Sequence, residues 1–289
     1  MRAIDIHVHP PTEPGSQTEE ELRAQQAMSS YFRQTEERPR TPADLAEIFE
    51  RHDIVACLLP VDSETITGKP YTGDAWVASI MNEFPDRFIG FGSVDPHKGK
   101  SGVLQVEKAV KDLGLRGFKF FPNGQQFFAN DKEYYPLWEK IQELGVPVIT
   151  HAGHAGVGSG RPGGGGIKLR YSNPMWWDDV AADFPELNII LAHPAWPWLE
   201  EQISMLVHKS NVYMDISGWS PRYFPEALVR EMHTRIQNKV LYGSDHPAIH
   251  VDRWWADWKE IAVNESITQK IFLDNAKRVL GIEDWPEKK

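Results

Sequence analysis

The chain has 289 residues, of which 41% are hydrophobic and 25% are charged, as expected for a folded globular protein and not for a disordered one. Its formal net charge of −10 argues against a nucleic-acid partner, because such a partner requires clustered basic residues. A single cysteine, Cys57, excludes an internal disulfide; since we also see no membrane-length apolar stretch and no signal peptide, we expect a cytoplasmic protein without membrane contact.

Apolar runs rich in β-branched residues alternate with helical patterns along nearly the whole chain. Strands that are covered on both faces have such near-continuous apolar sequences, so we interpret these runs as buried strands. Most of the segments between them are long enough for a crossover helix. The expected strands are 3–9, 54–60, 88–95, 115–122, 146–153, 187–195, 211–218 and 240–247.

Helix signals occur between these runs. Thr41-Pro42 places an N-cap residue before a proline at the first helical position. The segment 132–144 has apolar residues at helical spacing and stops before Gly145. Ser266 and Gln269 have capping-box spacing before a helical pattern that ends at Gly281.

Eight strand–helix units in a chain of this length predict an α/β fold, a (β/α)8 TIM barrel that forms a single domain over residues 1–289. A doubly wound open sheet is the alternative. It is less well supported, because no G-x-G-x-x-G pattern follows the first expected strand.

Two connections, after the first and the fifth expected strands, are unusually long. Residues 10–40 separate the first strand from its helix and have helical spacing around 20–32. Residues 154–172 follow the fifth strand and contain four consecutive glycines from Gly163. Both follow the carboxyl end of a strand, the face on which barrel enzymes build their sites. We interpret them as walls or lids of a substrate site, and plain surface loops are the alternative.

Histidine and aspartate residues occur at several expected strand ends. His7 and His9 are two residues apart on one strand, so their side chains point to the same face. His151, His193 and Asp245 stand at the ends of later strands. Imidazole and carboxylate groups are ligands of divalent metals, and the ends of parallel strands meet at one rim. The pattern therefore predicts a metal site.

The sequence resembles the amidohydrolase superfamily along its whole length, and more narrowly the group that contains aminocarboxymuconate-semialdehyde decarboxylase, γ-resorcylate decarboxylase and several lactonases. The resemblance rests on the motifs at 5–9, 117–122, 150–153, 191–194 and 242–247. It implies a (β/α)8 barrel in which His7, His9, His151 and Asp245 bind a metal. His193 would be the catalytic histidine or a ligand of a second metal.

Lys119 distinguishes two versions of this site. Strand alternation turns Phe118 and Phe120 to one side and Lys119 toward the barrel lumen. Beside a metal and away from water, Lys119 would lose its proton readily, so it could react with carbon dioxide and bridge two ions, as in binuclear members of the superfamily. Otherwise Lys119 is a cation that pairs with Asp245 or a substrate carboxylate. We favour a single divalent ion, with Zn as the first choice.

Further residues near the strand ends are candidates for substrate binding. His154 could contact substrate, and the basic loop residues Arg161, Lys168 and Arg170 could bind a carboxylate or phosphate. Trp176 and Trp219 could wall an aromatic or acyl pocket. The stretch 162–177 is similar to a subgroup described as 4-hydroxyphenyl-β-ketoacyl-CoA hydrolases, which implies a coenzyme A thioester as a possible substrate.

Other polar residues have less specific interpretations. Asp215 could orient a ligand histidine, and His246 is expected to support the site or the fold rather than to bind metal. We interpret the histidines on helical or loop patterns as incidental; they are His52, His97, His208, His233 and His250.

The expected function is that of a metal-dependent hydrolase in which metal-activated water attacks a carbonyl of a small aromatic or keto acid derivative, such as a lactone, ester or β-ketoacyl thioester. His193, Asp245 and Lys119 would be the catalytic residues. A metal-dependent, non-oxidative decarboxylase of the same fold is the first alternative, because the same ligands serve both reactions. A non-catalytic metal-binding barrel is the second. A homo-oligomer is compatible with the sequence.

Overall fold

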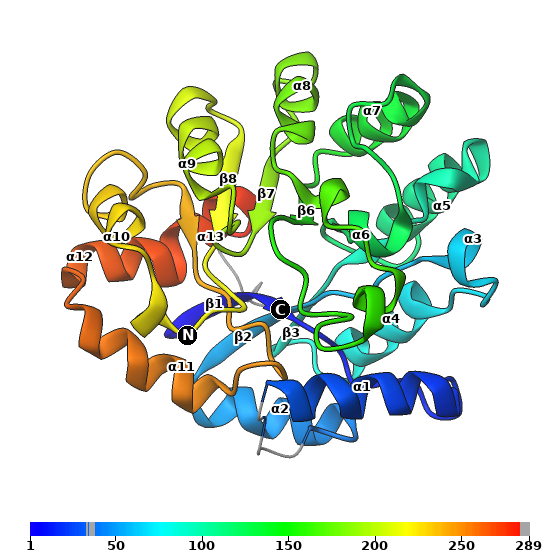
Figure 1. The fold of residues 1–289 in the computed structure, drawn as a ribbon, viewed down its shortest axis with the longest axis horizontal. Helices are drawn as coiled ribbons and strands as arrows, with labels where there is room; N and C mark the ends of the chain where they lie inside the picture. Colours follow the sequence, from blue (N-terminus) through cyan, green and yellow to red (C-terminus); the bar gives the residue numbers. More distant parts are fainter. Residues whose placement is uncertain (33, 35–37, 284–289) are drawn as a thin grey trace.

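The computed structural model describes residues 1–32, 34 and 38–283, and its strands form a central ring surrounded by helices (Figure 1). The strands are β1 (Ala3–Val8), β2 (Ile54–Leu58), β3 (Phe88–Gly90), β4 (Gly92–Ser93), β5 (Phe118–Phe120), β6 (Val148–His151), β7 (Ile189–Ala192), β8 (Val212–Asp215) and β9 (Val240–Leu241). Every expected strand run contains at least one of them.

All strand pairs are parallel, in the orders β1-β2-β3 and β4-β5-β6-β7-β8-β9. The ring closes between the first and last strands, where the backbone N–H of Ile6 donates to the Tyr242 carbonyl at 3.0 Å and Val8 forms a bridge with His246. The register of β1 against β2 shifts between Asp5 and Val8.

The third expected strand, 88–95, divides into β3 and β4 at Phe91. The N–H of Phe91 donates to Leu58 of β2 at 3.1 Å, whereas the N–H of Gly92 donates to Gly117, just before β5, at 2.8 Å. One apolar run thus connects the two ladders, which confirms the predicted (β/α)8 barrel.

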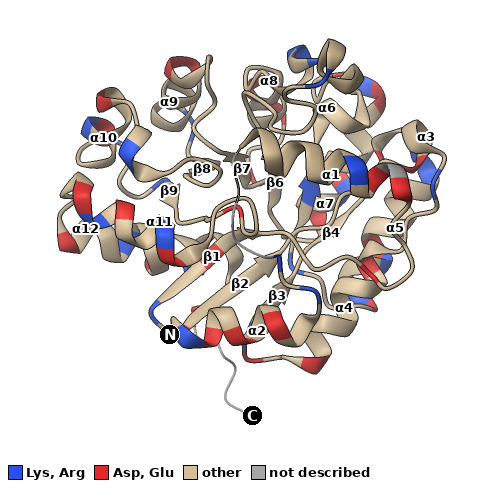
Figure 2. Ribbon diagram, turned by 60° about the horizontal axis from the view of Figure 1, so that its bottom comes forward, with Lys and Arg blue, Asp and Glu red and all other residues tan. Residues whose placement is uncertain are grey.

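Thirteen α-helices lie within the described residues, and most of them surround the outside of the ring. They are α1 (Glu19–Tyr31), α2 (Pro42–Arg51), α3 (Glu64–Thr67), α4 (Gly73–Glu83), α5 (Lys100–Lys111), α6 (Pro122–Gln125), α7 (Tyr135–Glu143), α8 (Trp176–Asp183), α9 (Leu199–His208), α10 (Glu226–Met232), α11 (Val251–Trp258), α12 (Glu265–Gln269) and α13 (Asn275–Leu280). Charged residues of both signs are distributed over these outer helices (Figure 2). None of the helices within the described part of the chain has both the length and the apolar character that a membrane crossing requires.

Most of the helix signals are confirmed, with one correction. The Thr41 side chain caps α2 by accepting from the N–H of Asp44 at 3.1 Å. Ser266 is not the N-cap of α12: that helix begins at Glu265, and Asn264 caps it by accepting from the Ser266 N–H at 2.9 Å. An asparagine one residue before the helix satisfies the same free N–H groups that a serine cap would satisfy.

Two apolar clusters hold the barrel together. The larger lies between ring and helices and includes Phe118, Phe120 and Trp138. The smaller contains Ile4, Phe91, Ile149, Ile190 and Leu241 together with α13. Burial of each such side chain stabilises the fold by about 1.5–3 kcal/mol. Because these two clusters fill the body of the barrel with apolar side chains, a functional site is expected at the ends of the strands.

The first long connection packs against the carboxyl-end face of the barrel. The Lys69 ammonium donates to both carboxylate oxygens of Glu21 in α1, at 2.7 and 2.9 Å. Trp76 Nε1 donates to the Pro11 carbonyl at 2.8 Å. Residues 33 and 35–37 of the predicted 10–40 connection lie outside the described residues. The rest confirms the predicted helical segment, since α1 spans Glu19–Tyr31.

Candidate active site

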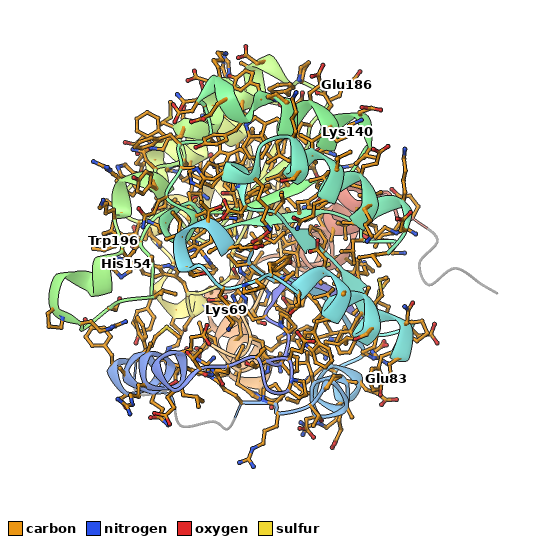
Figure 3. The ribbon with its side chains drawn as sticks, turned by 90° about the vertical axis from the view of Figure 1, so that its right-hand side faces the viewer. Lys69, Glu83, Lys140, His154, Glu186 and Trp196 are labelled. Atoms are coloured by element: carbon orange, nitrogen blue, oxygen red, sulfur yellow. The ribbon has the colours of Figure 1, made fainter. Side chains whose placement is uncertain are left out.

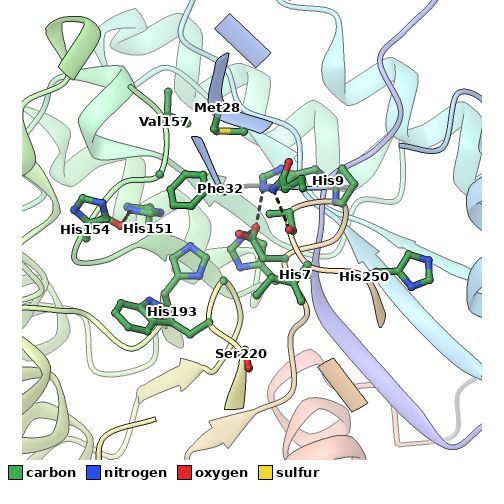
Figure 4. A pocket seen from close by; sticks show the side chains of 18 of the residues that line it. His7, His9, Met28, Phe32, His151, His154, Val157, His193, Ser220 and His250 are labelled. Atoms are coloured by element: carbon green, nitrogen blue, oxygen red, sulfur yellow. Dashed lines mark hydrogen bonds and ion pairs between the residues drawn. The ribbon is translucent and has the colours of Figure 1, made fainter. Parts of the chain in front are cut away.

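The carboxyl ends of the strands surround a cavity of about 590 Å³. Side chains from distant parts of the sequence meet at its inner end (Figure 4). They include every catalytic and metal-binding residue expected from the sequence: His7, His9, Lys119, His151, His193 and Asp245.

Three potential metal donors converge most closely. His7 Nε2 and His9 Nε2 lie 3.4 and 3.2 Å from the same oxygen, Oδ1 of Asp245. The other ring nitrogen of each histidine faces an acceptor: Nδ1 of His7 lies 2.9 Å from Asp215 Oδ2, and Nδ1 of His9 lies 3.2 Å from the Leu59 carbonyl.

These partners determine which ring nitrogen carries the proton. A carboxylate or carbonyl only accepts, so each Nδ1 is protonated and each Nε2 turns a lone pair toward Asp245. Burial, with Lys119 nearby, lowers the pKa of His7 to about 3, which keeps its imidazole neutral. Two imidazole nitrogens and a carboxylate oxygen that face one another are ligands of divalent metals, so the residues present fit such an ion.

Lys119 reaches the same cluster from β5, with Nζ 3.1 Å from His7 Nε2. Burial lowers its pKa to about 8, against the opposing effect of Asp215 and Asp245. The side chain faces the cavity, as strand alternation predicted. Its position is compatible with a cation that pairs with Asp245 and with a carboxylated bridging ligand.

His193 and His151 continue the row of imidazoles. The His193 ring centroid lies 4.8 Å from that of His7 and 4.8 Å from that of His151. The Nδ1 atom of His193 lies 3.0 Å from the Ser217 carbonyl, so its Nε2 is left for the cavity. His151 instead directs Nε2 to the His154 carbonyl at 3.1 Å. Among the described residues there are two compact donor groups: one contains His7, His9 and Asp245, and the other contains His7, His193 and Asp215. His151 belongs to neither, and its role as a ligand remains a prediction.

The backbone is strained at two of these residues. His193 and Asp245 have φ values of 72° and 65°, a left-handed conformation that non-glycine residues rarely adopt. Such strain is often found at functional sites, where the surrounding structure holds it in place. Gly218 allows the His193 ring to fit, because a Cβ atom there would lie 2.6 Å from His193 Nδ1.

Asp215 supports the cluster as the sequence suggested. Besides its contact with His7, its Oδ1 accepts from the N–H groups of His193 at 3.1 Å and Ser217 at 2.9 Å. His246 is buried behind the cavity wall, with its ring 5.7 Å from Phe49, consistent with a structural role.

The structure places two of the six predicted substrate residues at the cavity. His154 and Trp219 line the cavity, whereas Arg161, Lys168, Arg170 and Trp176 do not. The Arg170 guanidinium lies 5.1 Å over the Tyr171 ring, and Trp176 Nε1 donates to the Arg170 carbonyl at 2.8 Å. These local contacts hold the basic loop outside the cavity.

Several wall residues were not expected from the sequence. The first long connection contributes Met28, Phe32, Gln34 and Arg38. This agrees with its predicted role as a wall, although the sequence did not indicate which of its residues would reach the cavity. His250, which we had interpreted as incidental, also lines the cavity. His154, Gly156 and Val157 of the second long connection also line the cavity.

A family model described as amidohydrolase matches residues 4–282, nearly the whole chain. The chain belongs to the amidohydrolase family. This confirms the resemblance seen in the motifs, while the thioester hydrolase subgroup remains a prediction.

Curated relatives of this amidohydrolase include decarboxylases. A γ-resorcylate decarboxylase from Polaromonas sp. is 21% identical over 72% of this chain and 74% of the relative. A 2-amino-3-carboxymuconate-6-semialdehyde decarboxylase from Dictyostelium discoideum is 29% identical, over 26% of this chain and only 21% of the relative.

Solved structures show the same fold. A TIM-barrel protein from Bordetella bronchiseptica aligns with a TM-score of 0.82 at 22% identity, over 98% of this chain and 99% of that one. A dihydroxybenzoic acid decarboxylase from Polaromonas sp. with bound manganese has a TM-score of 0.67 at 17% identity, over 97% of each chain. A probable 2-pyrone-4,6-dicarboxylic acid hydrolase from Acinetobacter baumannii has a TM-score of 0.65 at 15% identity, over 97% of this chain and 100% of that one.

Proposed function

We propose that this amidohydrolase is a divalent-metal-dependent decarboxylase that removes a carboxyl group, without oxidation, from a hydroxylated aromatic acid or a β-keto acid. The observation that carries the proposal is the convergence of His7 Nε2, His9 Nε2 and Asp245 Oδ1 at the inner end of a largely apolar cavity. The relatives named as decarboxylases support this reaction over the hydrolysis that we expected first.

His7, His9 and Asp245 would hold the ion. When bound, it would supply a Lewis acid for the phenolate or keto oxygen next to the substrate carboxylate. The manganese in the Polaromonas structure supports a divalent ion without favouring zinc. Arg38 lines the same cavity and offers a guanidinium to a carboxylate.

The remaining residues would assist the bond changes. In a hydroxylated aromatic acid, the ring carbon that bears the carboxylate takes up a proton first; its bond to the carboxyl carbon then breaks, the bonding pair restores the aromatic ring, and carbon dioxide leaves. In a β-keto acid the bond breaks first, the pair forms an enolate, and the proton reaches the carbon afterwards. His193 can hold this proton at Nε2, because its Nδ1 faces the Ser217 carbonyl. Apolar wall residues such as Phe121 and Trp219 would reduce the contact of the carboxylate with water, which favours uncharged carbon dioxide over the charged carboxylate.

Hydrolysis of a carbonyl is the second candidate. The same donors could lower the pKa of a water molecule, and the pyrone hydrolase from Acinetobacter baumannii shares the fold. A coenzyme A thioester is not part of this proposal, since Arg161, Lys168 and Arg170 lie away from the cavity.

The test supplies the manganese-loaded enzyme with carboxyl-labelled γ-resorcylate, other hydroxybenzoates and β-keto acids, and separately with lactones and esters in oxygen-18 water. We expect labelled carbon dioxide, abolished by chelation and by His193→Asn and retained in the control Leu169→Ala, whose side chain lies outside the cavity. Oxygen-18 in a ring-opened or de-esterified product, without carbon dioxide from any acid, would establish hydrolysis instead. Metal binding without turnover of either panel would favour a non-catalytic barrel.

A further inference from the structure

The outer part of the cavity differs chemically from its inner end. Four large apolar side chains both line the cavity and remain exposed: Phe32 (45%), Val157 (49%), Trp196 (56%) and Tyr223 (67%). Within the described residues, they are four of the eleven exposed large apolar side chains. Single exposed apolar residues are common, but a group around one opening indicates a binding surface.

This apolar mouth is built where the two long connections meet. Phe32 follows α1, and its ring would lie 3.5 Å from a Cβ atom at Gly156. Next to it, the Tyr31 ring occupies the space that a Cβ atom at Gly160 would need, at 2.5 Å. Glycines in the second connection therefore allow the first to approach closely. On the other side, the Trp196 ring lies 5.5 Å from that of His154 (Figure 3).

The cavity is larger than the reacting part of a small aromatic acid requires. A cavity of about 150 Å³ accommodates a single benzene ring, so the 590 Å³ found here is roughly four times that size. His7, His9 and His193 lie together at the inner end (Figure 4), and Asp245 contacts the first two of them. The space beyond them is lined mainly by apolar side chains.

We propose that the substrate carries an uncharged apolar arm, the size of a second aromatic ring or a short acyl chain, attached to the skeleton that holds its reacting carboxylate or carbonyl. The arm lies among Phe32, Val157 and Trp196 while the reacting end faces His7, His9 and Asp245. This inference rests on the proposed function and specifies its substrate class: aryl- or acyl-substituted aromatic or keto acids rather than acids with a single ring.

The arm is uncharged because of the groups that surround it. The basic loop residues lie outside the cavity. Two arginines among the described residues line the cavity: Arg38 is the one offered above to the reacting carboxylate, and Arg253 lies 3.9 Å from the Asp257 carboxylate, which offsets its charge in part. An anionic arm would therefore gain little here, whereas apolar area removed from water contributes directly to binding.

The test compares binding of benzoate and biphenyl-4-carboxylate to the manganese-loaded enzyme by titration calorimetry. The two probes share the carboxylate and differ by one apolar ring, so we expect biphenyl-4-carboxylate to bind at least about tenfold more tightly. Phe32→Ala and Trp196→Ala should remove most of this gain and leave benzoate affinity unchanged. Leu169→Ala, at an exposed apolar residue outside the cavity, should keep the gain.

Equal affinities for the two probes, or a gain that survives both Phe32→Ala and Trp196→Ala, would overturn the apolar arm. So would failure of biphenyl-4-carboxylate to bind. In each of these cases, loss of benzoate binding on chelation would still support a metal at the inner end of the cavity. If benzoate binds equally well after chelation, the result counts against the proposed function itself.

Discussion

The buried carboxylate of Asp215 holds His7 by the ring nitrogen opposite the proposed metal position, with Oδ2 2.9 Å from Nδ1. Burial alone would raise the pKa of Asp215, but the hydrogen bonds from the His7 imidazole and the Ser217 side chain hold it well below its ordinary value. Asp215 is thus ionised, and it leaves His7 Nε2 with a lone pair directed into the cavity.

Asp215→Asn should weaken metal binding by roughly 10- to 100-fold, because an amide can donate to Nδ1 and would move the His7 proton to Nε2. Competition with a chromogenic chelator measures this affinity, and thermal unfolding of the metal-free variant checks the fold. The control is Asp183→Asn, on the far end of α8 in contact with Lys132. Unchanged affinity in Asp215→Asn would contradict the assigned orientation of His7.

Gly218→Ala should displace His193, since the new Cβ atom would lie 2.6 Å from its Nδ1. Gly218 also has a φ of 72°, so any side chain there adds backbone strain of about 1–2 kcal/mol. We expect kcat to fall more than about tenfold together with this loss of stability. Gly68→Ala is the control that separates backbone strain from displacement of His193. Gly68 has a φ of 68°, so alanine there adds similar strain, but nothing lies within 4 Å of its Cβ position. If both variants keep full kcat, Gly218 does not position His193.

Lys119→Met should leave the metal content at one ion per chain. The donors of His7, His9 and Asp245 converge without Lys119, so its loss removes a neighbouring cation and not a ligand. Elemental analysis of the purified variant against wild type and the surface control Lys132→Met gives the stoichiometry. A fall from two ions to one would instead identify Lys119 as a carboxylated bridge.

Glu231→Gln should lower stability near neutral pH and have less effect in acid. Paired hydrogen bonds from Arg235, at 2.7 and 2.8 Å, lower the pKa of Glu231 from 4.5 to about 2. A carboxylate with a depressed folded pKa contributes stability above its unfolded pKa, and this contribution disappears as the pH falls from 4.5 toward 2.

Denaturant unfolding of wild type and Glu231→Gln at several pH values between about 2 and about 7 measures this difference. Glu226→Gln, an exposed carboxylate on the same helix, is the control. A free-energy difference that stays constant across the whole range would show that the Arg235 pair contributes nothing to stability.

Much of the barrel and of the inner site was predictable because both follow from strand periodicity. Parallel strands bring their carboxyl ends to one rim, so His7, Lys119, His193 and Asp245 meet although they are far apart in sequence. Alternation along β5 was sufficient to turn Lys119 inward.

The cavity wall could not be predicted in the same way, because tertiary contacts between loops determine which side chains reach it. Arg170 rests on Tyr171 instead of facing the substrate space. His250 looked incidental because it lies on a helical or loop pattern, yet in the structure it precedes α11 and lines the cavity wall. Nothing in the local sequence marks His193 as a residue with positive φ, since its conformation depends on neighbours such as Gly218.

The left-handed backbone conformation of His193 and Asp245 lowers the folding stability at two residues that the proposed reaction requires. Glycine would occupy either position with less conformational penalty, so a chain relieved of its reaction would gain by discarding these side chains. An imidazole and a carboxylate thus stand where the main chain would hold glycine more easily, which is expected where the chemistry of the side chain, and not the stability of the fold, decides the residue.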